Sequence, residues 1–192
     1  EGQITLLGDE PALPYQRPPL SKAFLAGTLP LDRLYLRPAA FYQQAQVDVM
    51  VDTRVSELDT ENRRVRLTDG RAISFDHLVL ATGGRPRPLA CPGADHPRVH
   101  YLRTVTDVDR IRSQFHPGTR LVLVGGGYIG LELATVYAAL GSRVTVVEML
   151  PGLLAGADPD LVKVLSRRIS ARLEAILLET SVVEMKETKG GI

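Results

Sequence analysis

Cysteine and long apolar runs are scarce in this sequence of 192 residues, and each scarcity excludes a class of protein. The one cysteine, Cys91, excludes an internal disulfide, a zinc site built on several thiolates and a redox-active cysteine pair within the chain. Apolar runs such as residues 121–124 are far too short to cross a membrane. The formal net charge of +1 gives no basic surface for a nucleic acid.

The remaining composition is that of an ordinary globular protein, with 44% hydrophobic and 23% charged residues. The first residues lack the basic flank and the apolar stretch of a secretory signal, so we expect a soluble protein of the reducing cytoplasm. The four histidines share no metal-ligand spacing, and no serine, histidine and acid form a nucleophilic arrangement. We therefore expect no metal site, no nucleic-acid partner and no membrane partner.

The first half of the chain predicts short strands and a proline-rich loop. A strand is expected over residues 3–7, followed by a short helix that Ser21 would cap and a second helix from Pro38. Three short β-like runs joined by turn sequences predict an antiparallel meander. They cover residues 55–58, 64–67 and 72–75, and the apolar run 77–81 predicts a buried strand.

The second half alternates strands and helices, which predicts a parallel sheet of βαβ units and an α/β fold class. A last helix is expected from Pro159, capped by Asp158, with an apolar stripe that reaches Ile176. The other expected elements are a helix over 106–115, a strand over 121–124, a helix over 131–140, a strand over 144–147 and a strand over 177–185.

Residues 125–130 match the pattern G-x-G-x-x-G between a strand and a helix, which is the context that dinucleotide binding requires. Gly125 would permit the tight turn, Gly127 would let a pyrophosphate approach the backbone, and Gly130 would let the helix pack closely on the strand. The first N–H groups of the helix and its positive dipole end would hold the phosphates. A glycine-rich turn that binds nothing is the alternative, and it leaves the complete context unexplained.

The next strand ends at Glu148, which lies 18 positions beyond Gly130 (148 − 130), close to the spacing of about 20 for the acid that binds the adenosine ribose. A carboxylate at that place accepts hydrogen bonds from the ribose hydroxyls and repels a 2′-phosphate. The sequence therefore predicts NAD(H) as the coenzyme in preference to NADP(H).

Several further segments resemble the NADH-dependent ferredoxin reductases, flavoproteins of the putidaredoxin reductase and biphenyl dioxygenase reductase type. The resemblance covers about the first 148 residues. The segments that carry it are residues 7–10, 13–22, 35–37, 69–71, 80–89, 102–104 and 125–132. It implies a Rossmann-like fold of the glutathione-reductase type with two dinucleotide sites, FAD and NAD as cofactors, NADH as donor and an iron–sulfur ferredoxin-type acceptor. The implied domains are a partial FAD-binding domain over 1–104 and a partial NAD-binding domain over 105–192.

The resemblance also implies roles for single residues. Lys22 and Glu132 would form a catalytic ion pair near the flavin N5, where a cation stabilises the anionic reduced flavin. Without the resemblance, Lys22 would be a solvated helix residue and Arg103 a surface charge. The implied cofactor contacts are Asp9 at the FAD ribose, Arg17 and Lys22 beside the flavin, Val55 near the adenine, the backbone of Ala81, Thr82 and Gly83, Arg103 near the pyrophosphate, and Gly125, Gly127, Tyr128, Ile129, Gly130 and Glu148 around NAD.

Two other functions stay open. After Glu148 the sequence looks more like dihydrolipoamide dehydrogenase, but its dithiol mechanism needs a cysteine pair that this chain does not contain. A nucleotide-binding fragment without turnover is the second alternative. No first FAD strand with its glycine fingerprint precedes residues 3–7, so we expect an incomplete fold, from a fragment of a longer flavoprotein or an imperfect record of its sequence.

Overall fold

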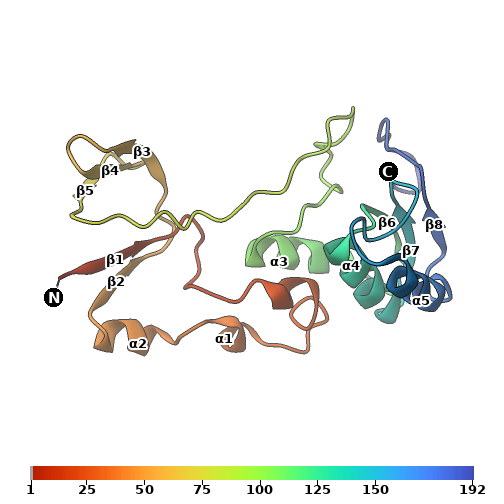
Figure 1. Ribbon diagram of the computed structural model, residues 1–192, viewed down its shortest axis with the longest axis horizontal. Coiled ribbons are helices and arrows are strands. Elements are labelled where there is room, and N and C mark those ends of the chain that lie inside the picture. Colours follow the sequence, from red (N-terminus) through yellow and green to blue (C-terminus); the bar gives the residue numbers. More distant parts are fainter. Residues whose placement is uncertain (1) are drawn as a thin grey trace. The chain divides into compact units, whose positions relative to one another are not determined.

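The computed structural model describes residues 2–192, which form two compact units (Figure 1). The first unit holds the chain up to residue 16 together with residues 31–85, and the second holds residues 17–30 and 86–192. The predicted division of the chain at residues 104 and 105 stays a prediction. In the described part of the chain, no helix is both long and apolar enough to span a membrane.

The first unit contains a parallel strand pair and two short helices. Strand β1 (Ile4–Leu7) pairs with β2 (Val47–Met50), with Ile4 opposite Val47. Between them lie helices α1 (Leu31–Leu34) and α2 (Ala39–Gln44). Pro38 precedes α2 in an extended conformation, where its fixed φ suits a helix start and its missing N–H costs no hydrogen bond.

The predicted antiparallel meander is confirmed. It consists of β3 (Val55–Asp59), β4 (Arg64–Leu67) and β5 (Ala72–Ser74), in that order in the sheet. Valine and leucine alternate with arginine along β4, so Val65 and Leu67 are buried while the arginines face outward. The β4–β5 turn contains Gly70 at a φ of +89°, a conformation that glycine adopts without steric cost.

The predicted buried strand over residues 77–81 is wrong. This stretch is irregular, and the side chains of Val79 and Leu80 are 85% and 68% exposed. A strand forms only where a neighbouring strand completes its hydrogen bonds. In residues 2–192, the sheets that contain β1 and β2 or the meander do not include this run.

The second unit begins with a tight turn and a capped helix. The 3₁₀ helix η1 (Pro18–Ser21) replaces the predicted α-helix, so Ser21 ends a turn instead of capping a helix. Helix α3 (Val105–Gln114) begins with a capping box, in which the Thr104 hydroxyl accepts from the Asp107 N–H and the Asp107 carboxylate accepts from the Thr104 N–H.

The predicted parallel sheet is confirmed, with strands in the order β6 (Arg120–Val124), β7 (Arg143–Val147), β8 (Ala175–Leu177). The predicted bounds of the last strand, 177–185, are wrong, because β8 ends at Leu177 and residues 178–185 are irregular. Helix α4 (Tyr128–Ala139) connects β6 to β7, and α5 (Pro159–Ser170) connects β7 to β8. Residues 120–177 of the second unit therefore form two consecutive βαβ motifs. Val144 and Val146 of the central strand are fully buried, together with Leu131 and Ala134 of α4.

The last helix differs from its predicted extent. Asp158 caps α5 and Pro159 is its first residue, as predicted, but the helix ends at Ser170 and Ile176 lies in β8. Its apolar stripe is also not uniformly covered, because Ile169 is buried whereas Leu161 is 71% exposed. The helix was predicted too long because the leucine and isoleucine beyond Ser170 continue the helical spacing, although the same residues fit the start of a strand equally well.

Candidate functional site

The glycine turn between β6 and α4 is closed by direct contact of two glycine backbones. Gly125 has a φ of +112°, and its N–H donates to the carbonyl of Val147 at 2.8 Å. A Cβ added to Gly130 would lie 2.0 Å from the carbonyl oxygen of Gly125, closer than any two such atoms can approach. Glycine at position 130 therefore lets the first turn of α4 sit against the end of β6.

Gly127 precedes α4 in an extended conformation and leaves the helix start open. It provides no side-chain cap, and a Cβ placed on it would meet no atom within 4 Å. The N–H groups of the first helical turn have no partner within their own helix, so an uncapped start leaves them available to an anion. Tyr128 and Ile129, the first two residues of α4, are 66% and 61% exposed.

The carboxylate of Glu148 is held beside the glycine turn by two backbone N–H groups. Gly126 donates to Oε2 at 2.6 Å and Leu150 donates to Oε1 at 2.8 Å. Gly126 is a residue that the sequence pattern did not single out. A Cβ on it would lie 2.6 Å from Leu153 and 3.2 Å from the Glu148 side chain, so its size allows the carboxylate to reach the turn.

Arg143 lies at the other end of β7, where it forms an ion pair with Glu174. Its guanidinium is thus matched to a carboxylate at the start of the strand, whereas Glu148 follows the end of the strand. The carboxylate of Glu148, just beyond the end of β7, therefore borders the glycine turn, and the Arg143 guanidinium does not.

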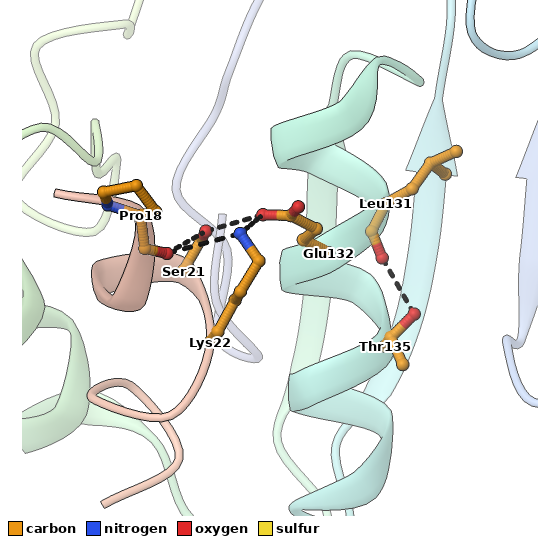
Figure 2. Close-up of polar contacts among 6 residues, drawn as sticks. All are labelled: Pro18, Ser21, Lys22, Leu131, Glu132 and Thr135. Atoms are coloured by element: carbon orange, nitrogen blue, oxygen red, sulfur yellow. Dashed lines mark hydrogen bonds and ion pairs between the residues drawn. The ribbon is translucent and has the colours of Figure 1, made fainter. Parts of the chain in front are cut away.

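Lys22 and Glu132 form the ion pair that the resemblance to ferredoxin reductases implies. Figure 2 shows the Lys22 ammonium and the Ser21 hydroxyl directed at the Glu132 carboxylate on α4. Both donate to the same oxygen, Oε2, at 2.7 Å. Lys22 also donates to the carbonyl of Pro18 at 3.3 Å, so its ammonium bridges η1 and α4.

The pKa of the Glu132 carboxyl results from two opposing effects. Partial burial favours the neutral acid, while the hydrogen bonds from Lys22 and Ser21 favour the carboxylate and outweigh burial. The pKa is therefore held below the ordinary value for glutamate. At neutral pH this site contains a carboxylate, an ammonium group and a hydroxyl, and the side chain of Lys22 is 49% exposed.

Arg17 and Arg103 are also brought together in the second unit. The Arg17 guanidinium donates to the backbone carbonyl of Arg103 at 2.7 Å. The N–H of Arg103 donates to the capping carboxylate of Asp107 at 3.0 Å. The hydrogen bond from Arg17, the residue before η1, therefore connects η1 to the segment that leads from Arg103 into α3.

The site residues predicted in the first unit lie after the end of β1, at the start of β3 and in the irregular segment over residues 81–83. Asp9 is exposed just after β1, where the neighbouring Gly8 carbonyl accepts from the Thr53 N–H at 2.8 Å. Val55 follows this contact by two residues and is 40% exposed. Ala81, Thr82 and Gly83 are exposed, and Gly83 has a φ of +65°.

Comparison with known proteins identifies the family. The model of the pyridine nucleotide-disulphide oxidoreductases matches residues 1–191. The chain belongs to this family. Membership implies FAD and a pyridine nucleotide as cofactors, and the glycine turn fits the nucleotide, because it offers an uncapped helix start with no Cβ in the way.

Relatives within the family are ferredoxin reductases. The chain is 43% identical to the ferredoxin–NAD(+) reductase subunit of the benzene 1,2-dioxygenase system of Pseudomonas putida, over all of this chain and 45% of that protein. Among solved structures, the ferredoxin reductase for the CYP199A2 system of Rhodopseudomonas palustris is 36% identical with a TM-score of 0.93, covering 98% of this chain and 47% of that one. The covalent putidaredoxin reductase–putidaredoxin complex is 36% identical with a TM-score of 0.90, covering 100% of this chain and 47% of that one.

The chain thus spans a little under half the length of these family relatives. The similarity to the benzene dioxygenase reductase extends over all 192 residues, including the part after Glu148. The Rossmann-like, two-dinucleotide fold class predicted from the sequence is confirmed by the family and by these structures.

Proposed function

We propose that this chain carries the NADH-binding turn and part of the flavin-facing surface of an FAD-dependent NADH:ferredoxin oxidoreductase. The observation that carries the proposal is that one helix, α4, joins two sites. Its uncapped first turn follows Gly127, and Glu132 in the same helix holds the ammonium of Lys22. A site for a dinucleotide phosphate and a fixed cation are therefore separated by about one helical turn.

The chain's own residues would bind the coenzyme and tune charge. The N–H groups at the start of α4 would hold the pyrophosphate, and the free lone pairs of the Glu148 carboxylate would accept the adenosine ribose hydroxyls. Lys22, kept in place by Glu132, would stabilise negative charge at the reduced cofactor. Asp9, Arg17, Val55, Arg103 and the backbone at Ala81, Thr82 and Gly83 are the proposed contacts to FAD.

The chemistry that bound FAD would supply is acceptance of a hydride from NADH and return of the two electrons, one at a time, to two oxidised iron–sulfur acceptors, with release of one proton. The names of the relatives support this acceptor, since they are ferredoxin reductases at 43% and 36% identity. The lone Cys91 of the chain supports it as well, because a disulfide reductase of the dihydrolipoamide dehydrogenase type needs a cysteine pair.

The first test is the visible absorption spectrum of the purified chain with added FAD, followed by NADH-driven reduction of a one-electron dye. A flavin spectrum at close to one FAD per chain, with dye reduction that depends on NADH, would support the proposal. Saturable NADH binding with a colourless protein and no dye reduction would support the alternative of a nucleotide-binding fragment without turnover.

The second test concerns the choice of NADH over NADPH. Glu148→Ala is expected to reduce the preference for NADH by roughly ten- to a hundredfold, because hydrogen bonds to a charged group contribute about 1.5–3 kcal/mol. It also removes the acceptor of the Gly126 and Leu150 N–H groups, so NADH affinity should fall as well. The measurement is kcat/KM for both coenzymes.

The matched control for the coenzyme test is Glu174→Ala, which removes a carboxylate of the same unit that pairs with Arg143. It should leave the preference unchanged. A wild-type protein that already prefers NADPH would contradict the assignment of Glu148 to the ribose.

A further inference from the structure

The hydroxyl of Ser21 contributes to the ion pair in a way that neither the glycine motif nor the proposed chemistry uses. Ser21 is 6% exposed, and its hydroxyl donates to Glu132 Oε2 at 2.7 Å. The ammonium of Lys22 donates to this same oxygen at the same distance. The carboxylate oxygen therefore receives two donors from adjacent residues of the chain, one buried and one exposed (Figure 2).

The two donors differ in mobility. Ser21 has one rotatable side-chain bond and ends the 3₁₀ turn η1, in which Leu20 is also buried. Phe24 and Leu25, just beyond the turn, are 4% and 2% exposed and anchor it in the second unit. Lys22 has four rotatable bonds and is 49% exposed, and an exposed lysine–carboxylate pair by itself adopts several geometries.

From this difference, we propose that Ser21 is a positioning residue, whose buried hydroxyl fixes Glu132 Oε2 so that the Lys22 ammonium is held at one place between η1 and α4. Its consequence for hydride transfer rests on the proposed function. The effect of Ser21 on the position of the Glu132 carboxylate does not depend on the proposed function, because Ser21, Lys22 and Glu132 all belong to the second unit. Among the residues that the structure describes, the Lys22 ammonium and the Ser21 hydroxyl are the side-chain donors to the Glu132 carboxylate.

Removal of the hydroxyl should change both the protonation and the position of Glu132. In Ser21→Ala the carboxylate keeps the Lys22 donor but loses the serine hydroxyl, so its ionised form loses stabilisation and the pKa of Glu132 rises toward the ordinary value or above it. The acidic limb of any activity that needs the ion pair then moves to higher pH. A mobile ammonium also lowers the rate of flavin reduction, by roughly ten- to a hundredfold if it is displaced by about 1 Å.

The experiment compares the wild type with Ser21→Ala and Ser21→Thr, the second of which retains a hydroxyl. Ser21→Cys, of similar size with a weak donor, serves as a further variant should alanine prevent folding. The control is Thr135→Val, which removes a hydroxyl of α4 that donates to the Leu131 carbonyl and does not contact Glu132 (Figure 2). Titration of the Glu132 carboxyl carbon by NMR, assigned with Glu132→Gln, is the first readout, and stopped-flow flavin reduction by NADH is the second.

We expect a raised Glu132 pKa and slower flavin reduction in Ser21→Ala and Ser21→Cys. Ser21→Thr should restore the wild-type pKa and rate, and Thr135→Val should change neither. An unchanged Glu132 pKa in folded Ser21→Ala or Ser21→Cys would overturn it. The titration needs neither cofactor, so it decides the role of Ser21 even where the wild type shows no flavin reduction, a result that would count against the proposed function alone.

Discussion

Gly130→Ala is expected to destabilise the nucleotide-binding unit and to weaken NADH binding together. Alanine is the better helix former, by about 1 kcal/mol in an exposed helix interior. At this position its Cβ would lie 2.0 Å from the Gly125 carbonyl oxygen, and neither atom belongs to a flexible side chain. The start of α4 must therefore move away from the end of β6. Overpacking of this kind typically costs about 1–3 kcal/mol, so the net effect should be a loss.

The measurement is urea unfolding followed by circular dichroism, with NADH titration of the folded variant. Gly127→Ala is the matched control for stability, because it adds the same methyl group three residues earlier, where no atom lies within 4 Å. We expect the control to keep the wild-type free energy of unfolding within about 1 kcal/mol. A Gly130→Ala variant that is more stable than the wild type would show that helix propensity outweighs the backbone contact.

This glycine turn is also the part of the molecule that the sequence predicts best. Its context is local: the apolar run of β6, three glycines and the helix α4 follow one another within 20 residues (120–139). Local periodicity and turn chemistry determine such a unit almost alone. The same holds for the meander of β3, β4 and β5, whose strands are joined by short turns.

Features that depend on distant contacts were predicted poorly. The hydrogen bond of Ser21 to Glu132 joins residues 111 positions apart, and the local sequence around Ser21 indicates only a helix cap. Nothing in the pattern G-x-G-x-x-G distinguishes Gly126, whose importance comes from the approach of Glu148 and Leu153. The apolar run 77–81 has the composition of a strand but lacks a paired neighbour in the described structure, and composition cannot supply one.

The resemblance to ferredoxin reductases adds what local pattern does not provide. It predicted the Lys22–Glu132 pair across 110 positions, and the structure contains that pair at 2.7 Å. The residues it assigned to FAD, such as Asp9 and Val55, stay predictions. The backbone hydrogen bond from Thr53 to Gly8 brings the segments that contain them together at the end of β1.

Gly127→Val is expected to abolish NADH binding while leaving the fold intact. The structure has no atom within 4 Å of a Cβ at this position, and its φ of −81° suits an L-residue, so valine meets no steric conflict in the free protein. The loss of a favourable N-cap residue should cost no more than about 1 kcal/mol. In the proposed complex, however, the branched side chain would occupy the space in which the pyrophosphate approaches the first N–H groups of α4.

The measurement is NADH affinity from the quenching or enhancement of its fluorescence, with urea unfolding of the same variant. We expect the dissociation constant to rise at least about a hundredfold, equivalent to ~2.7 kcal/mol of lost binding free energy. Gly127→Ala, with its smaller side chain, should lie between wild type and Gly127→Val in affinity and keep the wild-type free energy of unfolding within about 1 kcal/mol. Because valine leaves the free protein undisturbed, it can weaken binding only by occupying the space of the ligand. Unchanged NADH affinity in Gly127→Val would therefore mean that the ligand does not use this space and that the turn has a purely structural role.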